Sequence, residues 1–281
     1  MPQKECVEYT YTSIHREGMR AWKRMFRELF YSRELIYRFF VRDFVARYKQ
    51  SVFGYIWVFA PTIIAVVAMT YIKNAKIVPI AETEIAYPVF VLLGMTIFQF
   101  FSSGIVASAN SIVGASNLVA KINFTRETLV FASFGQSLLE FMMRTCLVIF
   151  AFLWFHIIPA KSVIFIPFVL IPFAMLTIGL GFFAALMNAV FRDVGLFIAL
   201  VVGSLIVLTP VMYPAATEWP YILINFINPV SPFVIAVQDL TIKGYLSQPE
   251  LFVFGCALSI LYFFGGWRIF NIAMPRVIER I

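Results

Sequence analysis

The sequence predicts an all-α membrane protein. We expect six transmembrane helices, an N-terminal amphipathic interface helix and short re-entrant outer helices between spans five and six. Of the 281 residues, 61% are hydrophobic and only 13% are charged, against about 25% charged in a soluble domain. Long apolar runs alternate with short polar segments, and most basic residues lie in segments on one side. Because so few polar side chains could not cover a soluble surface, this composition excludes a disordered protein, a disulfide scaffold and a nucleic-acid-binding domain.

Residues 1–50 form a polar, cationic region that carries 11 of the 22 Lys and Arg residues. Apolar side chains recur there at helical spacing: Trp22, Met25, Phe26, Leu29 and Phe30, then Tyr37, Phe40, Val41, Phe44 and Tyr48. Glu34, Arg38 and Arg42 follow one another at i,i+4 steps on a different face. This pattern is typical of a helix lying in the membrane interface with its basic side toward the head groups. The alternative is a basic helix that binds calmodulin or nucleic acid.

Residues 51–281 form the expected transmembrane domain. A spanning helix needs about 20 mostly apolar residues, and the chain has such runs at Phe53–Ile72, Tyr87–Val113, Leu129–Phe155, Val163–Val190, Val194–Tyr213 and Leu251–Phe270. An even number of spans places both termini on one side of the membrane. With cytoplasmic termini, the inner segments together with Arg268 at the inner end of the last span carry 17 Lys and Arg residues, and the outer loops carry four. The positive-inside rule therefore predicts a multi-pass inner (cytoplasmic) membrane protein with both termini in the cytoplasm.

The segment between the fifth and sixth spans, residues 214–248, is too apolar for a simple hydrated loop. It is interrupted by Pro214, Pro220, Pro229 and Pro232, and these prolines prevent one continuous helix. Two short helices that dip back into the outer leaflet fit this pattern, because irregular backbone at membrane depth must be buried in protein or line a cavity. The alternative is a loop packed on the outer surface.

Motifs for catalysis or cofactor binding are absent from the sequence. There is no G-x-x-x-x-G-K-[ST], G-x-S-x-G or H-E-x-x-H. The three cysteines and two histidines are widely spaced, so we expect neither a disulfide framework nor a metal site. If transport by this chain needs ATP, a separate chain must supply the ATPase. We therefore expect no enzyme activity and no cofactor in this chain, with ATP and Mg bound by the partner, and no nucleic-acid partner.

Glu140 and Arg144 form the sharpest polar feature inside a predicted span. They lie at i,i+4 in the third span, so they share one face and can pair. A lone charge at a helix centre costs about 2.5–3.5 kcal/mol on insertion scales. The pair is therefore either a polar patch on a substrate route or a structural ion pair between helices.

The second predicted span carries a polar stripe flanked by aromatic rings. Thr96, Gln99, Ser103 and Asn110 recur at steps of three, four and seven residues, with Phe98 and Phe101 beside them. Hydroxyl and amide groups next to aromatic rings suit a sugar chain, which offers hydroxyls and apolar C–H faces. The same groups suit hydrogen bonding between helices, and both interpretations stay open.

Several sequence blocks resemble those of the ABC-2 type permeases, in particular the polysaccharide exporters for O-antigen, capsule and teichoic acid. The blocks are Leu35–Asp43, Ala46–Gly54, Tyr55–Trp57, Phe191-Arg192-Asp193, Thr209–Pro214 and Asn228-Pro229. The most specific of these is the run Arg47–Ser51 followed by Gly54 and Trp57, and Asn228-Pro229 is weak alone. The resemblance extends from about residue 30 to the C-terminus. After Asn228-Pro229 the family often has an acidic residue and an Arg, where this chain has Val237-Gln238-Asp239.

The resemblance implies a homodimer of six-span subunits with two ATP-binding cassette subunits on the cytoplasmic side. ATP hydrolysis would drive a lipid-linked polysaccharide outward through a conduit between the protomers, as in O-antigen export for lipopolysaccharide biosynthesis. The substrate-path candidates are Thr96, Phe98, Gln99, Phe101, Ser103, Asn110, Glu140 and Arg144. The implied contacts with the ATPases are Arg38 and Arg42 in the interface helix, Ala120, Lys121 and Arg126 in one cytoplasmic loop, and Arg192 and Asp193 in the other.

Three other functions remain open on the sequence alone. The first is an ABC-2 exporter of another amphipathic lipid or drug. The second is a membrane-embedded glycosyl- or acyltransferase, against which the lack of clustered polar catalytic residues argues. The third is a secondary transporter, which would need ionisable residues at the membrane midplane for ion coupling.

Overall fold

The computed structural model describes residues 18–49, 53–116, 118, 124–191 and 193–278, and this part of the chain is helical without any strand. The N-terminal helices are α2 (Gly18–Tyr31) and α3 (Arg33–Tyr48), followed by the short 3-10 helix η1 (Gly54–Val58) and α4 (Ala60–Asn74). The long helices α5 (Tyr87–Gly114) and α7 (Glu127–Trp154) come next. The remaining elements are η2 (Lys161–Phe165), α8 (Ile166–Val190), α9 (Val194–Leu208), α10 (Ile222–Ile227), α11 (Ser231–Ile242) and α12 (Pro249–Ile278).

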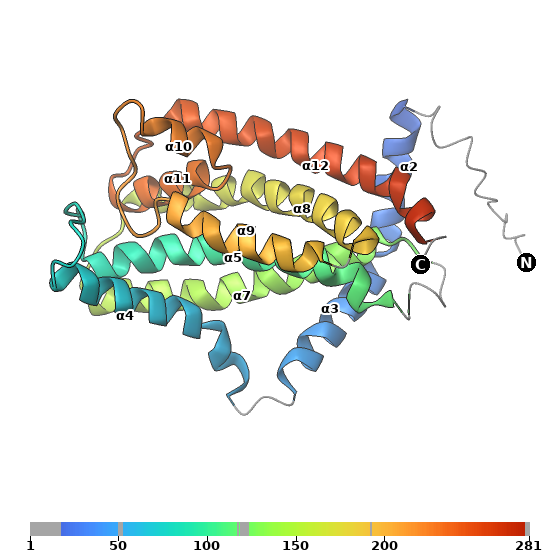
Figure 1. Cartoon of the computed structure of the whole chain (residues 1–281), viewed down its shortest axis with the longest axis horizontal. Helices are drawn as coiled ribbons and strands as arrows, with labels where there is room; N and C mark the ends of the chain where they lie inside the picture. The colour runs from blue at the N-terminus through green and yellow to red at the C-terminus, as the bar shows by residue number, and fades with distance from the viewer. Residues whose placement is uncertain (1–17, 50–52, 117, 119–123, 192, 279–281) are drawn as a thin grey trace, which may run out of the picture.

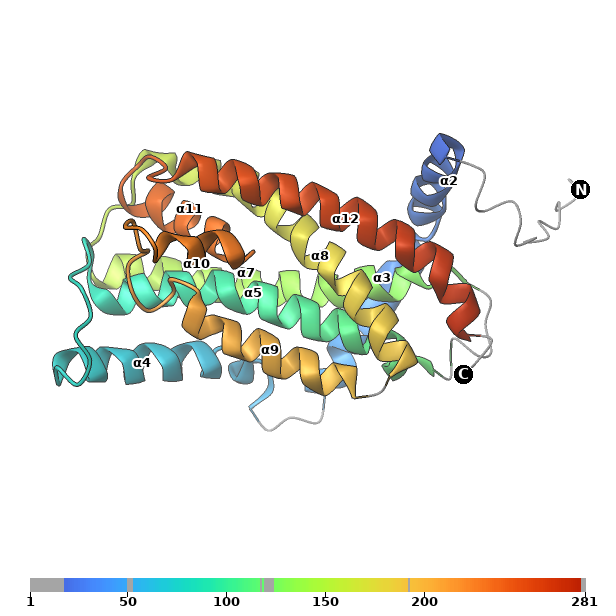
Figure 2. The same cartoon turned by 45° about the horizontal axis from the view of Figure 1, so that its top comes forward.

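The helices α4, α5, α7, α8, α9 and α12 run lengthwise through the molecule (Figures 1 and 2). At one end, which we call the α2 end, lie α2, the start of α3, residues 124–126, the turn between α8 and α9, and the last turns of α12. At the other end, the α11 end, lie α10, α11 and the connections after α4 and α7. The connections thus alternate between the two ends, as expected of a chain that crosses a membrane repeatedly.

Among the described residues, four helices are long and apolar enough to cross a membrane: α5, α7, η2 with α8, and α12. They correspond to the second, third, fourth and sixth predicted spans. The first predicted span is divided into η1 and α4, and Pro61 lies in the first turn of α4, where a missing N–H costs no helical hydrogen bond. The fifth ends as a helix at Leu208, because Pro210 forces the preceding Thr209 into an extended conformation. These two predicted spans are therefore shorter as helices than the apolar runs suggested.

Helix α5 lies at the centre of the bundle and packs against α4, α7, α8, α9 and α11. Of its most apolar stretch, 78% is buried within the chain, compared with 28–33% for the other three long helices. Large apolar side chains on α4, α7, α9 and α12 are exposed, as expected of surfaces that meet lipid or another apolar chain.

The two N-terminal helices differ in how they distribute apolar side chains. Helix α2 is strongly amphipathic, with Ala21 and Met25 fully buried. Helix α3 has little amphipathic character: Tyr37, on its predicted apolar face, is exposed, and the buried ring is Phe39, which that face does not include. The predicted interface region therefore comprises one amphipathic helix and one helix in which apolar and charged side chains are mixed around the axis.

The proline-rich segment between the fifth and sixth predicted spans contains two short helices, α10 and α11. Every side chain from Ser231 to Thr241 in α11 is buried. Asn228 holds the start of α11 against the end of α9, since its Nδ2 donates to Thr209 Oγ1 at 2.8 Å and its Oδ1 accepts the Val230 N–H at 3.0 Å. This segment is therefore an integral part of the packed bundle.

Helices α8 and α12 approach so closely that their backbones touch. A Cβ atom on Gly179 of α8 would lie 2.5 Å from backbone atoms of Tyr262 in α12, and a Cβ on Gly266 would collide with the carbonyl oxygen of Gly179. A Cβ on the neighbouring Gly265 would meet nothing within 4 Å. Close approach through small residues is the usual way in which apolar helices associate in membranes.

We expect Gly266→Ala to destabilise the protein by about 1–3 kcal/mol, because the new methyl group must push α12 away from α8. Gly265→Ala is the matched control, since it makes the same change one residue earlier and meets open space. Thermal unfolding of the purified chain in detergent would measure both. Equal effects of the two substitutions would show that the α8–α12 contact does not contribute.

Candidate functional site

The side chains predicted to line a substrate path lie on the central helix α5, where they occupy two environments. Thr96, Phe98 and Phe101 are buried within the bundle. Thr96 Oγ1 donates to the carbonyl of Leu92 in its own helix at 2.8 Å, and the Phe101 ring stacks on Phe173 of α8 with centroids 6.0 Å apart. In the single chain these three residues are part of the helix packing.

The other three predicted path residues lie on a more accessible side of α5. Gln99 and Ser103 are half-buried, and Asn110 is exposed near the α2 end. Ser103 Oγ is 3.4 Å from the carbonyl oxygen of Phe100, and Asn110 Nδ2 donates to the carbonyl of Val106 at 3.0 Å. None of the six residues lines either of the two cavities described below.

A buried asparagine connects three helices near the α2 end. Asn188 of α8 donates through Nδ2 to the Ala109 carbonyl at 2.9 Å and to Asn110 Oδ1 at 3.2 Å, and its Oδ1 accepts the Gly195 N–H at 2.7 Å. A Cβ on Gly195 would lie 2.9 Å from Asn188 Oδ1, so this contact depends on glycine. Asn188 is not among the residues predicted from the sequence. The signal that could have identified it is a single amide side chain within an otherwise apolar helix.

The predicted Glu140–Arg144 pair is present, and the structure adds a third charged residue to it. Arg144 Nη2 lies 3.3 Å from one carboxylate oxygen of Glu140, and Arg47 of α3 lies 2.7 Å from the other. Arg144 Nε also donates to the carbonyl of Val58 in η1 at 3.2 Å. Glu140 and Arg144 are both 4% exposed, so their charges need such compensation. We call Arg47, Glu140 and Arg144 the charge cluster; it connects α3, η1 and α7.

A second buried carboxylate fixes the amphipathic helix α2 to the bundle indirectly. Glu127, at the start of α7, accepts hydrogen bonds from Trp267 Nε1 at 3.0 Å and Asn271 Nδ2 at 2.6 Å, both of α12. The oriented indole of Trp267 meets the edges of Trp22 and Phe26 from α2, with ring centroids 6.0 and 4.9 Å away. Sequence reasoning missed Glu127, because its partners lie 140 and 144 residues further along the chain.

Residues 124–126 contact the hinge between α2 and α3. Thr125 Oγ1 is 3.1 Å from Ser32 Oγ, and the rings of Phe124 and Phe39 are 5.4 Å apart. Arg126, a predicted coupling residue, donates to the Phe124 carbonyl at 2.8 Å. The α2 end therefore connects α3 directly to the segment that begins α7.

The remaining predicted coupling residues are exposed where the structure describes them. Arg38 pairs with Glu34 at 2.6 Å, and Arg42 pairs with Asp43 at 2.7 Å. Asp193 is exposed at the N-cap position of α9, at the same end of the molecule. Ala120, Lys121 and Arg192 lie outside the described residues.

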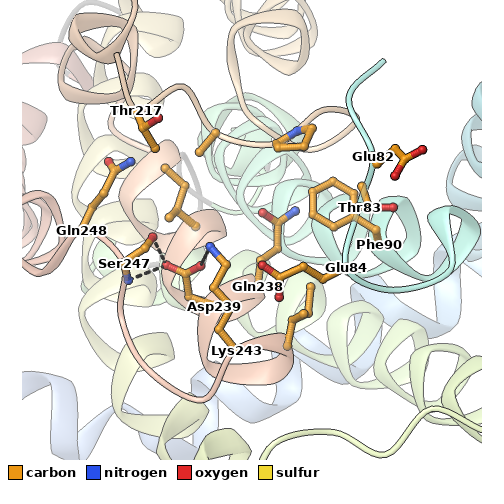
Figure 3. Close-up of a pocket in the computed structure, with 14 residues that line it drawn as sticks. Glu82, Thr83, Glu84, Phe90, Thr217, Gln238, Asp239, Lys243, Ser247 and Gln248 are labelled. Carbon is orange, nitrogen blue, oxygen red and sulfur yellow. Dashed lines mark hydrogen bonds and ion pairs between the residues drawn. The ribbon is translucent and has the colours of Figure 1, made fainter. Parts of the chain in front are cut away.

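A polar cavity of about 140 Å³ lies at the α11 end (Figure 3). One wall is α11, where the buried Asp239 pairs with Lys243 Nζ at 2.9 Å and accepts hydrogen bonds from the backbone N–H and hydroxyl of Ser247. Glu82 and Glu84 come from the α4–α5 connection. Burial lowers the pKa of Lys243, but the hydrogen bond and charge of Asp239 outweigh this, so the pKa is raised overall.

This polar cavity bears on the one departure from the family pattern noted above. In Val237-Gln238-Asp239, the acidic residue finds its cationic partner one helical turn later, at Lys243. Gln238 Nε2 donates to the Pro210 carbonyl at 3.2 Å. Among the described residues, no group of three His, Cys, Asp or Glu side chains could hold a metal ion.

We expect Arg144→Ala to destabilise the protein less in a Glu140→Ala background than in the wild type. Breaking a buried pair costs about 3–5 kcal/mol, of which the contact between Arg47 and Glu140 offsets a part. Removal of both Glu140 and Arg144 leaves no uncompensated charge in the interior, because Arg47 is half exposed. The exposed Glu34–Arg38 pair is the control, with an expected coupling of about 0.3–0.5 kcal/mol. Thermal unfolding of both double-mutant cycles would measure this, and purely additive effects at Glu140 and Arg144 would contradict it.

The comparisons with known proteins identify the family of this chain. Two O-antigen export system permease proteins RfbA of Klebsiella pneumoniae are 26% and 28% identical to this chain, over 82% of it and 88% of their own length. The O-antigen export system permease protein RfbA of Myxococcus xanthus is 24% identical over 92% of this chain and 99% of its own. The family model of the ABC-2 type transporter matches residues 34–242, from α3 to α11, which include the charge cluster and most of the residues that line the α11-end cavity. The chain therefore belongs to the ABC-2 type transporter family.

Proposed function

We propose that this chain is the membrane-spanning permease subunit of an ATP-driven exporter that moves a lipid-linked polysaccharide from the cytoplasmic side outward. The observation that carries this proposal is the agreement between the family match over residues 34–242 and the relatives, each named an O-antigen export permease. Export of another amphipathic lipid or a drug, or a glycosyltransferase activity, has no comparable support.

The proposed topology has six spans, with the α2 end in the cytoplasm. The four long apolar helices supply four spans, and η1 with α4 and α9 with its extended continuation supply the other two. The stretch from Gly54 to Asn74 reaches the roughly 20 residues that a span requires. The cytoplasmic assignment follows from the excess of Lys and Arg in the segments at the α2 end. In this arrangement α10 and α11 are the re-entrant outer helices.

The proposed assembly contains two copies of this chain and two ATP-binding cassette subunits. The exposed apolar side chains of α9, such as Phe197, Leu200 and Val207, offer a surface for the second copy. Because α9 packs beside α5, a path between the copies would run along the accessible side of α5, past Gln99 and Ser103. The buried residues Thr96, Phe98 and Phe101 would join that path only when the helices around α5 separate.

The α2 end is the proposed contact with the ATPase subunits. It carries Arg38 and Arg42 on an exposed face of α3, together with Arg126 and Asp193; Ala120, Lys121 and Arg192 belong to the same connections. A push on α3 would reach α7 by two routes. One runs through Ser32, Phe39 and residues 124–126, and the other runs through Arg47 to Glu140. We therefore assign Glu140 and Arg144 to this mechanical link. Of the two interpretations given for the pair, this is the structural ion pair between helices and not the polar patch on a substrate route.

Deletion of the gene tests the function directly. Cells without it should lose polysaccharide from their surface while the lipid-linked precursor accumulates inside, because synthesis continues without export. A copy of the gene on a plasmid should restore both amounts. Normal surface polysaccharide in a deletion strain that has no second exporter would contradict the proposal, and glycosyl transfer by the purified chain alone would favour the enzyme alternative.

We expect Asp193→Lys to lower export severalfold without loss of the assembled complex, since charge reversal at the proposed contact should uncouple ATP hydrolysis from transport. Glu218→Lys, an exposed charge reversal at the α11 end, is the control. Surface polysaccharide and the ATPase rate of the purified complex would be measured together. Unchanged export in Asp193→Lys would remove this residue from the proposed contact.

A further inference from the structure

An apolar groove of about 320 Å³ lies between α4 and α7, in the half of the bundle nearer the α11 end. Its walls include Val66 and Val67 of α4 and Leu147, Ala151 and Trp154 of α7. All of its lining residues are apolar, and its volume is many times the ~30 Å³ that one water molecule occupies. Such a groove offers water no hydrogen-bond partners, so hydrocarbon suits it better than solvent.

The groove and the charge cluster belong to one continuous seam. Leu147, Ala151 and Trp154 follow Arg144 after three, seven and ten residues, so they lie on the same face of α7 as the guanidinium group. On the opposite wall, Val58 accepts a hydrogen bond from Arg144 and leads directly into α4. From Arg144 to Trp154 the helix rises by about 15 Å. The seam therefore has a cationic base and an apolar length extending away from it.

Charge at the base of the seam favours an anion. Two guanidinium groups meet one carboxylate there, and the Arg47 side chain is 48% exposed although it contacts the nearly buried Glu140. An exposed Arg at the cytoplasmic membrane surface attracts anionic head groups. Phosphate oxygens accept strong charge-assisted hydrogen bonds from guanidinium.

The chemistry of the seam favours a lipid over a second copy of the chain. An anionic phospholipid combines a phosphate for the cationic base with an acyl chain for the apolar groove. We propose that the seam binds an anionic phospholipid, with its phosphate beside Arg47 and one acyl chain in the groove between α4 and α7.

Native mass spectrometry of the full chain in detergent tests this, with phosphatidylglycerol and phosphatidylcholine as competing probes. Phosphatidylglycerol should be retained preferentially, and Arg47→Gln should lower its retention about fivefold. Arg38→Gln on the exposed side of the same helix should leave retention unchanged. Arg47→Lys, which keeps the charge, should preserve most of the binding even if the contact with Glu140 is altered.

The groove is tested separately by Val67→Trp, which fills it from the α4 side and should lower retention of both lipids. Leu153→Trp introduces the same side chain at an exposed position of α7 that does not line the groove, and it should have no effect.

Equal retention of the two lipids, or equal effects of Arg47→Gln and Arg38→Gln, would overturn the proposal. A change of oligomeric mass in Val67→Trp without loss of lipid would instead make the groove a contact between copies. Because lipid retention is read on the chain itself, failure here would leave the proposed export function untouched.

Discussion

The carboxylate of Glu140 is the interaction on which the arrangement of the N-terminal helices depends. It lies inside the bundle and accepts one guanidinium from its own helix and one from α3. A buried carboxylate cannot lose either cation cheaply, so α3 is held to the side of α7. Glu127 does the same at the start of α7, where it orients Trp267 against α2. Helix α7 is thus attached to α3 through an ion cluster, and to α2 indirectly through the indole of Trp267 in α12.

Local sequence patterns predicted the parts of this structure that depend on neighbours in the chain. The long apolar helices and the Glu140–Arg144 pair are local, and both are present. The Asp239–Lys243 pair has the same i,i+4 spacing and could have been found in the same way. Pro61 and Pro210 likewise carried the signal that the first and fifth apolar runs would not be helical throughout, because proline restricts the residue before it and ends the helical ladder.

The contacts that sequence reasoning missed join residues far apart in the chain. Arg47 reaches Glu140 across 93 residues, and Asn188 reaches Ala109 across 79. Neither residue has a local pattern that names its partner, because the pairing exists only once the helices are packed. For the same reason, the sequence could not predict which residues of the polar stripe on α5 are accessible. A regular spacing of Thr96, Gln99 and Ser103 puts them on one face, but the neighbouring helices decide which of them is covered.

The glycine contact between α8 and α12 determines which parts of the bundle can move. Where two helix backbones touch without side chains between them, no side chain can change its rotamer to let one helix shift against the other. These two helices therefore behave as one rigid body, with Gly179 and Gly266 as the point that locks them. Helices α4 and α9, by contrast, rest mainly on α5 and leave wide apolar faces uncovered. Any widening of the bundle has its degrees of freedom in α4 and α9, while the α8–α12 pair serves as the fixed frame against which they shift.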